Sequence, residues 1–354
     1  MAEFLLSDLQ IAMSLLPETA INTPFSLTAD FIGVRANALP PHVPQVQTVD
    51  NMDMIGGGDE FADDVRLYNW LQQPLTLSGK LNAETAAYWL IRALNGTVTD
   101  AAVTAATSYD HSVPMQTRAQ GRTPKYTTLI MNLGGADVVL ASMAVNSFSI
   151  SQQGTNEPQF SVELIGTGNF RRLRDIAPAI VMPYPTEHHY FHGAAAVIVL
   201  NDGVVKNLSS LARVRSWSVG IQNNLVVGDR RPGDPFKTAG DVRTGAYVRS
   251  LLRGKRTASA QLKLALDENL DELDWLTDDT TLTGLSIKNV GEPIGATPEK
   301  FEVEWKVPNF KVQAITGDSE GDDATLTVNF SPLRDAVSGG LVTARVRNNI
   351  AAML

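Results

Sequence analysis

Apolar and polar residues alternate along several segments of this chain. Between residues 301 and 307 four apolar side chains alternate strictly with three charged ones, and shorter alternating runs occupy residues 160–164, 217–221, 262–266 and 326–330. A period of two places every apolar side chain of a segment on one face of a strand. Strands with one wet face are typical of antiparallel sheets, because parallel strands are covered on both faces. The pattern therefore predicts a mainly β protein built from antiparallel sheets.

Two segments show helical spacing instead. Residues 82–95 begin at Asn82, a residue type that caps helix N-termini, and are followed by Gly96, which is typical just past a helix end. The apolar stripe of this first segment consists of Ala83, Ala87, Leu90 and Leu94. The apolar stripe of the second segment, residues 267–276, consists of Leu270, Leu273 and Leu276. We predict one α-helix over each segment.

The two halves of the chain repeat one order of elements. In each half a predicted strand leads into a helix that contains a Trp-Leu pair, Trp89-Leu90 and Trp275-Leu276, and a predicted hairpin follows downstream. The repeat indicates either a duplication or two small β domains that look alike because hairpins look alike. A segment with three prolines between residues 176 and 187 supplies a candidate boundary.

From this order we predict three parts of the chain. Residues 1–20 are expected to form a short amphipathic arm, residues 21–176 a first β domain and residues 177–354 a second one. The length of 354 residues favours two domains over one. The Pro- and Gly-rich segment 37–60 has no place in this scheme.

Composition narrows the classes of function. The chain has no cysteine, which excludes disulfide scaffolds, thiolate nucleophiles, iron–sulfur clusters and Cys-ligated zinc. It carries 29 Lys and Arg residues against 38 Asp and Glu residues, and a net charge of −9 argues against a surface that grips phosphates everywhere. No run of 18 apolar residues occurs, so we expect no insertion into a membrane. The acidic N-terminus differs from a secretory leader, so we expect the protein to stay where it is made.

Patterns for catalysis and cofactors are missing. The chain contains no phosphate-binding P-loop, no zinc-protease motif, no serine-hydrolase elbow and no calcium loop. Residues 166–171 begin like a dinucleotide-binding loop, but Arg171 stands where a third glycine is required. His188, His189 and His192 lead into a strand, which would direct their side chains to opposite faces, so we interpret them as surface or interface residues. We predict no catalytic site, no metal and no cofactor.

Basic residues gather in a long loop. Residues 229–245 are rich in Gly, Pro, Asp and Arg and connect two predicted strands, which is longer than an ordinary hairpin loop. The wider stretch 229–256 holds eight basic residues against three acids. This stretch is either a solvated basic loop or an interface with an acidic partner surface. Its candidate residues for contacts with another chain are Arg230, Arg231, Lys237 and Arg243.

Acidic residues gather just downstream. Seven of the thirteen residues 267–279 are Asp or Glu. Helical spacing fits them better than a calcium loop, and a solvated helix face is the simplest interpretation. The alternative is an acidic partner for the basic loop, or a face that lines a channel. The candidate residues are Asp271, Glu272, Asp274 and Asp278.

Two predicted hairpins have similar sequences. The first is Val145-x-Ser147-Phe148-Ser149-Ile150 closing on residues 160–166, and the second is Val214-x-Ser216-Trp217-Ser218-Val219 followed by the long loop and residues 258–262. They resemble the hairpins of the tail tube proteins of long-tailed bacteriophages. The strand–acidic-helix–strand order of 260–307 and the final strand 325–330 fit the same family, so that the similarity covers most of residues 65–350. The resemblance implies an antiparallel β-sandwich or barrel flanked by an α-helix, here two in tandem.

The resemblance also implies partners and a location. Such proteins join copies of themselves into rings, which are usually hexameric, and stack the rings into a tube for DNA ejection. If the duplication is real, three chains would make a ring with pseudo-sixfold symmetry. Other tail proteins and double-stranded DNA that passes without specific binding would be the further partners, in a virion whose tail is assembled in the host cytoplasm. We expect the channel face to carry net negative charge, and the basic stretch 229–256 to lie between subunits or rings.

Other functions stay open from the sequence. A neck or distal tail protein would form one ring and never stack. A monomeric β-sandwich could bind a glycan through its loops, although few aromatic residues fall in predicted loops. An enzyme would need an acid pair such as one within residues 267–279.

Overall fold

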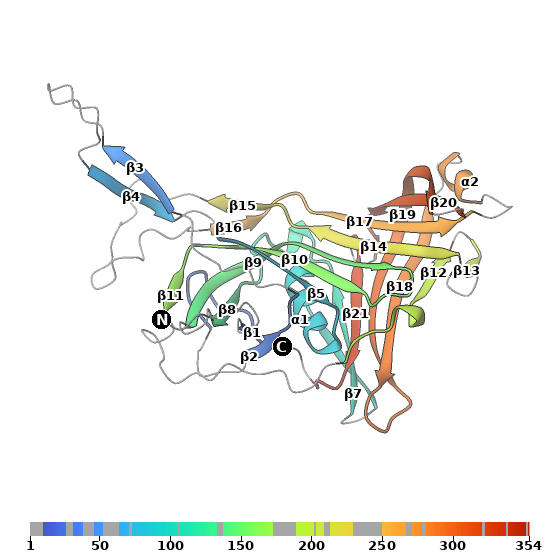
Figure 1. The fold of residues 1–354 in the computed structure, drawn as a ribbon, viewed down its shortest axis with the longest axis horizontal. Helices are drawn as coiled ribbons and strands as arrows, with labels where there is room; N and C mark the ends of the chain where they lie inside the picture. The colour runs from blue at the N-terminus through green and yellow to red at the C-terminus, as the bar shows by residue number, and fades with distance from the viewer. Residues whose placement is uncertain are drawn as a thin grey trace.

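The computed structural model describes most of the chain as antiparallel β-structure (Figure 1). It describes residues 10–25, 31–37, 46–51, 64–70, 73–104, 107–132, 137–172, 189–201, 203–208, 213–228, 250–266, 271–277, 281–320, 323–337, 339–351 and 353. These residues form 21 strands and two α-helices, and the register pairs between neighbouring strands are antiparallel. The mainly β, antiparallel fold predicted from the alternating pattern is confirmed.

Seven strands form what we call the long layer. In spatial order they are β5 (Gln73–Lys80), β10 (Gln159–Gly166), β9 (Asp137–Gln153), β14 (Val214–Gln222), β17 (Thr257–Ala265), β20 (Asp323–Leu333) and β19 (Lys300–Glu320). Their registers align apolar residues across the sheet: Val162 lies between Leu77 and Phe148, and Val219 lies between Ile150 and Ala260. Because the side-chain period is two, this register places all of these residues on one face.

A second set of strands forms what we call the cross layer. In spatial order they are β13 (Val205–Asn207), β12 (Val197–Asn201), β18 (Leu282–Pro293), the first half of β19, β21 (Thr343–Asn348), β7 (Ser108–Pro114) and β6 (Thr99–Thr104). In the view of Figure 1, β7, β18, β19 and β21 run across the direction of β14 and β17. Strand β19 belongs to both layers, since residues 300–310 pair with β18 and residues 309–320 pair with β20.

The N-terminal strands extend the long layer at one end of β9. Strands β2 (Phe31–Val34), β1 (Gln10–Ser14) and β8 (Thr127–Asn132) pair in that order onto the first half of β9, which also pairs with β11 (Phe170–Arg172). Two separate hairpins are formed by β3 (Val46–Asn51) with β4 (Asp64–Trp70) and by β15 (Leu225–Gly228) with β16 (Ser250–Arg253). Residues 10–14 of the predicted N-terminal arm are thus a core strand, and residues 46–51 of the unplaced segment form β3.

Helix α1 (Ala83–Leu94) fills the space between the layers. It packs against β9 on one side and against β21, β7 and β19 on the other. The Asn82 side chain accepts a hydrogen bond from the Thr85 N–H at 2.9 Å, as the predicted N-cap requires. At the other end the left-handed residue is Asn95, with φ of 58°, instead of the predicted Gly96. Gly96 is needed for another reason, because a Cβ there would lie 1.8 Å from the Pro114 carbonyl oxygen.

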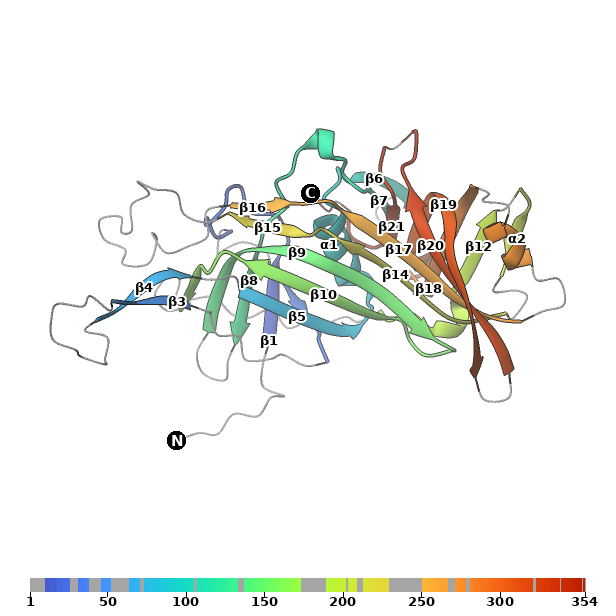
Figure 2. The same cartoon turned by 90° about the horizontal axis from the view of Figure 1, so that it is seen from above.

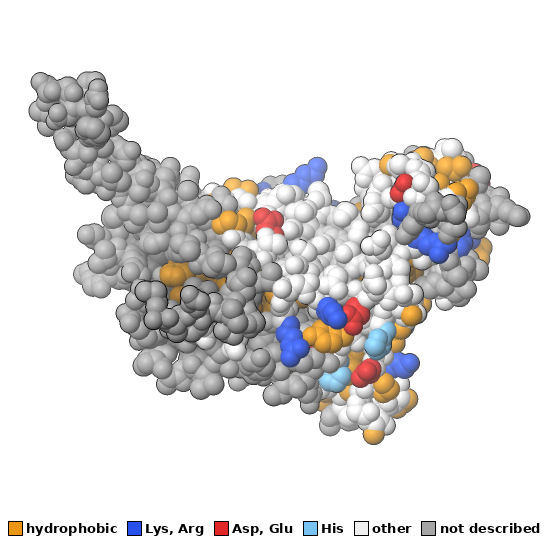
Figure 3. Space-filling model, in the orientation of Figure 1, with side chains coloured by type: hydrophobic (Ala, Val, Ile, Leu, Met, Phe, Trp, Pro, Cys, Tyr) orange, Lys and Arg blue, Asp and Glu red, His pale blue; other side chains and the backbone are white. Residues whose placement is uncertain are grey.

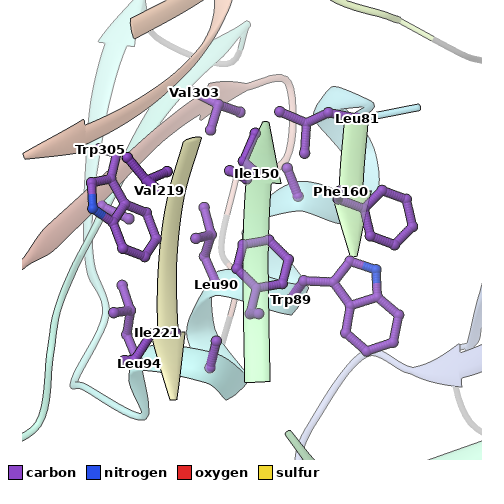
Figure 4. Close-up of a cluster of buried hydrophobic side chains, with 14 of the residues drawn as sticks. Leu81, Trp89, Leu90, Leu94, Ile150, Phe160, Val219, Ile221, Val303 and Trp305 are labelled. Atoms are coloured by element: carbon purple, nitrogen blue, oxygen red, sulfur yellow. The ribbon is translucent and has the colours of Figure 1, made fainter. Parts of the chain in front are cut away.

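The core surrounds α1 on all sides (Figure 4). Every residue of the helix except Glu84 is buried, and Trp89, Leu90 and Leu94 belong to one core cluster with apolar side chains from both layers. The predicted single apolar stripe understates this burial. A helix that is buried all round is expected where sheet covers it on two faces.

The two halves of the chain repeat one spatial order of strands. In the first half β5, β10 and β9 are adjacent, and in the second half β17, β20 and β19 are adjacent in the same way. The halves share two ladders, β9 with β14 and β7 with β21. The predicted boundary between residues 176 and 187 lies outside the described residues, so the division into 21–176 and 177–354 stays a prediction.

Candidate assembly surfaces

The face of the long layer that points away from α1 is polar but carries few charges. It consists of the residues that alternate with the buried ones, and most of them are Ser, Thr, Asn or Gln. Representative members are Thr76, Ser78, Ser149, Ser151, Ser161, Ser216, Ser218, Ser259, Gln261, Thr327 and Asn329. The space-filling view over β5 and β10 accordingly contains few charged side chains (Figure 3). We call this surface the polar face.

The charges on the polar face are matched by partners in the same chain. Lys263 forms an ion pair with Asp318 at 3.2 Å, and Lys80 forms one with Glu157. The Glu163 carboxylate accepts hydrogen bonds from the Asn146 side chain at 3.0 Å and from the neighbouring Ser147 hydroxyl. The described part of the face is therefore hydrophilic without a strong field of either sign.

The long layer has at each end an edge with which no further described strand pairs. Among the described strands β5 pairs with β10 alone, apart from one backbone hydrogen bond from the Asn37 N–H to the Ser78 carbonyl oxygen at 2.7 Å. At the other end, residues 311–320 of β19 pair with β20 alone among the described strands. Unpaired edges of this length are templates for pairing with another chain.

The outer face of the cross layer carries a ladder of ion pairs. Arg345 contacts Asp110 at 3.0 Å, Glu302 at 2.5 Å and Glu304 at 3.0 Å, and so joins strands β21, β7 and β19. Burial favours a raised pKa for Asp110, but the hydrogen bond from Arg347 and the charges of both arginines outweigh it and lower the pKa. The alternating charges of residues 302–306 and 345–347 are the signal for this ladder in the sequence, but they predict only a wet strand face and not which charges pair.

A family model for the phage tail tube protein matches residues 67–332 of the chain. The chain belongs to the phage tail tube protein family. A search of curated proteins finds no match. Membership makes the chain a structural component of the virion tail, as the resemblance of its hairpins predicted.

The basic residues predicted to connect copies of this tail tube protein belong to the segment between β15 and β16. Arg230, Arg231, Lys237 and Arg243 lie within residues 229–249, outside the described residues. The strands that flank this segment are described, and β15 and β16 pair with each other from Leu225↔Arg253 to Gly228↔Ser250. The segment is thus the connection of a two-stranded hairpin, and its role in assembly stays a prediction.

Three of the four acidic candidates, Asp271, Glu272 and Asp274, fall on helix α2 (Asp271–Thr277), and one of them needs a correction. Glu272 is fully buried and forms an ion pair with Arg213 at 2.9 Å, so its carboxylate is not on the wet face. Leu273 and Leu276 of the predicted apolar stripe are 40% and 39% exposed, while Trp275 is buried. Asp274 is exposed, as predicted.

The other two acidic candidates have no described side chain. Asp271 begins the helix, but its side-chain environment is not described. Asp278 lies outside the described residues. Whether the acidic candidates meet a basic partner or line a channel stays a prediction.

The histidine segment packs against the start of α1. The His189 ring pairs with Glu84 and stacks on Phe301 with 4.1 Å between ring centroids. Within the described ranges no group of three or more His, Asp or Glu side chains is placed to hold a metal ion. No helix in the described part of this tail tube protein is long and apolar enough to cross a membrane.

Proposed function

We propose that this tail tube protein assembles with itself into closed rings that stack into the tube through which DNA leaves the virion, and that it has no catalytic activity. The observation that supports this proposal most directly is the long layer, an antiparallel sheet whose two end strands each have an edge that no further described strand covers. A contact between two different edges is heterologous, and such contacts form a ring when the rotation between copies closes.

The internal repeat supports a ring of three chains. Strands β9 and β14 join the two repeats inside one chain, with Val219 opposite Ile150. If the same kind of junction joins the open edge of β19 to the β5 side of the next copy, every chain supplies two equivalent units. Three chains then form a ring with pseudo-sixfold symmetry, in which 21–176 and 177–354 are the two tube-like units, each with its own helix.

The polar face is the best candidate for the channel wall. Unpaired cations on a protein surface displace the counterions of DNA and so bind it. A wall that conducts DNA must therefore lack unpaired cations. Ser, Thr and Gln side chains keep the wall wet, and Lys80 and Lys263 are held by acids of the same chain. This wall is near neutral on the described strands, in contrast to the net negative wall that the sequence predicts.

Microscopy and mass measurement test the proposal together. Purified protein at micromolar concentration is expected to show rings and stacked tubes by negative-stain electron microscopy, with ring masses that are multiples of three chains. Single rings that never stack would favour a neck or distal tail protein instead. A monomer as the sole species by sedimentation would contradict the proposal.

A further inference from the structure

His111 of β7 is a fully buried histidine that the assembly proposed above does not involve. Its side chain is 0% exposed and lies on the same face of the sheet as that of Val346, the residue directly opposite it on β21. Val346 belongs to the core around α1. Buried polar atoms need hydrogen-bond partners, because a buried donor or acceptor without one costs stability. The partners of the two ring nitrogens therefore indicate which protons the ring carries.

Both ring nitrogens of His111 face oxygen acceptors. Strands β6, β7 and β21 lie side by side in that order (Figure 2). Nδ1 lies 2.6 Å from Oδ1 of Asp100, the residue directly opposite His111 on β6. Nε2 lies 2.9 Å from Oδ1 of Asn348, the last residue of β21. A neutral imidazole has one N–H and one lone pair, so it can donate to only one of these oxygens, whereas the imidazolium donates to both.

The orientation of the Asn348 amide is fixed by the backbone. The Ile350 N–H donates to the same Oδ1 at 2.9 Å, so the amide oxygen and not the NH2 group stands at this position. The buried Asn348 Nδ2 has no hydrogen-bond partner among the described residues. The amide thus forgoes the bonds of its own NH2 group and presents one oxygen to both the His111 ring and the Ile350 N–H. This arrangement requires a proton on His111 Nε2.

The contacts of His111 anchor the segment that follows β21. Ile350 packs against the core, and Met353 is 2% exposed within it. The Met353 N–H donates to Oδ2 of Asp100 at 3.4 Å, which is the other oxygen of the carboxylate bonded to His111. Residues 348–351 and 353, which we call the latch, are thereby tied to β6 and β7 at two points.

The other charged groups around His111 have partners of their own. Strands β6 and β21 and helix α1 pack against β7. Besides Asp100, the charged and titratable residues of these elements and of β7 are Glu84, Tyr88, Arg92, Tyr109, Asp110, Arg345 and Arg347. Asp110 and the two arginines of β21 form the ion-pair ladder on the opposite face of β7. Glu84 pairs with His189, and Arg92 donates to backbone carbonyls. Asp100 is thus the anion beside the His111 ring.

We propose that His111 and Asn348 form a pH-sensitive switch, in which one proton on the ring fastens the latch and its loss releases it. Histidine changes its charge between about pH 5 and pH 8. When the ring loses the proton on Nε2, a lone pair faces the Asn348 oxygen, and two acceptors in contact repel each other. The amide then rotates to donate from Nδ2 to the ring, and the Ile350 N–H loses its acceptor. The turn that begins the latch is released by this exchange.

A spin label tests the switch, since the chain has no cysteine and a single one can be introduced. Ala351→Cys carries a nitroxide label at an exposed position of the latch. In dissociated subunits, the electron paramagnetic resonance spectrum should show a mobile fraction that rises about threefold or more between about pH 5.5 and pH 8.5. The same label at Thr277→Cys, an exposed residue of α2, should show no such rise.

Substitutions at the ring and at the amide supply a second measurement. His111→Gln carries no charge, so the label at residue 351 should be mobile at every pH. His192→Gln, at an exposed histidine, is the matched control and should keep the response of the parent protein. Asn348→Asp presents a carboxylate to the ring and to the Ile350 N–H, so the midpoint of release should move up by about one pH unit or more. This second variant tests the switch even where a thermal melt shows that His111→Gln does not fold.

The outcomes are independent of the proposed function. A label whose mobility does not change with pH would overturn the switch, as would an equal response in the parent protein and in a folded His111→Gln variant. A midpoint that Asn348→Asp leaves in place would overturn it as well. Rings or tubes that form without any pH response of the label would leave self-assembly standing. A chain that never assembles but shows the expected response would overturn the proposed function and support the switch.

Discussion

Arg92 of helix α1 donates a hydrogen bond from Nη2 to the carbonyl oxygen of Ser14, the last residue of β1, at 2.6 Å. Arg92 is 1% exposed, and its guanidinium also donates to the carbonyl oxygens of Leu15 and Tyr88 and to the Thr127 hydroxyl. A buried arginine thus joins the central helix to the strand that begins the described part of the chain.

Replacement of Arg92 by Met should destabilise the protein strongly. The methionine fills similar space but leaves the carbonyl oxygens of Ser14 and Leu15 without their donor, and we expect a loss of about 3 kcal/mol in the free energy of unfolding. Chemical denaturation measures it. The matched control is Arg122→Met, which removes an exposed arginine and should change the free energy little. An Arg92→Met protein as stable as the wild type would contradict this account.

The stability that Glu18 contributes should fall as pH rises, which is the opposite of what most carboxyl groups in folded proteins do. Burial raises its pKa above the ordinary 4.5, despite hydrogen bonds from the Ser142 N–H at 2.6 Å and the Thr128 hydroxyl at 2.7 Å. The folded state therefore holds this proton more tightly than the unfolded state, so the stability that Glu18 contributes is full below pH 4.5 and declines as pH rises through the folded pKa.

Denaturation of the wild type and Glu18→Gln across pH 4 to 8 tests this sign. The difference in unfolding free energy between the two proteins should move in favour of the variant as pH rises. Glu292→Gln, at an exposed site, should show a constant difference from the wild type. A constant difference for Glu18→Gln as well would show that the carboxyl titrates alike in both states.

The ion-pair ladder should give the opposite pH response. Burial raises the pKa of Asp110 and of Glu304, but their partners outweigh it in both cases. The arginine contacts lower the pKa of Asp110 below 3.8. The Ser286 hydrogen bond and the charges of Lys306 and Arg345 lower the pKa of Glu304 below 4.5. Their stabilisation is present above these values and is lost as pH falls through the folded pKa. Arg345→Ala should cost about 2 kcal/mol at pH 7 and should lose less stability than the wild type between pH 4.5 and 3. Parallel acid titrations of the two proteins would refute the assignment.

A single cysteine can report which face lines the channel. Ser259 is an exposed member of the polar face, and Lys300 is exposed on the β18–β19 hairpin. In assembled tubes a bulky polymer maleimide should react with Lys300→Cys but not with Ser259→Cys, whereas dissociated subunits should react at both positions. Equal labelling of Ser259→Cys in tubes and in subunits would exclude the polar face as the wall.

The loop 229–245 is expected to connect rings and to contribute little to the fold. A short Gly-rich link between Val227 and Ala246 should leave the melting temperature near the native value, since each doubling of loop length costs only about 0.6 kcal/mol. Rings should still form, but stacking should stop. Arg230→Glu with Arg231→Glu should weaken stacking in the same direction. Full-length tubes from the shortened protein, seen by electron microscopy, would exclude the loop as the connector.

Local patterns predicted the strands well because each strand buries one face. The alternation at 301–307 and 217–221 appears in the structure as buried Trp305 and Trp217 with polar neighbours. The same reasoning failed for α2, where Leu273 is exposed and Glu272 is buried. Glu272 is buried beside its partner Arg213, which comes from the segment before β14. A contact between residues so far apart in the sequence leaves no local signal.

The sequence likewise predicted some of the features related to assembly and not others. The resemblance of the hairpins predicted the family, and the basic stretch 229–256 contributes Arg253, Lys255 and Arg256 to the walls of one pocket. Its other walls come from residues 115–122 and 334–341, which the sequence does not connect to one another.

Strand β19 has a mechanical consequence for a molecule that forms a wall. One covalent backbone of 21 residues passes from the cross layer into the long layer, with β18 and β21 beside its first part and β20 beside its second. Ladder hydrogen bonds between antiparallel strands lie perpendicular to the strand axis, so tension along β19 loads them in shear, many at a time. A pull along β19 is therefore transmitted from one layer to the other, and the two layers resist it as one elastic body.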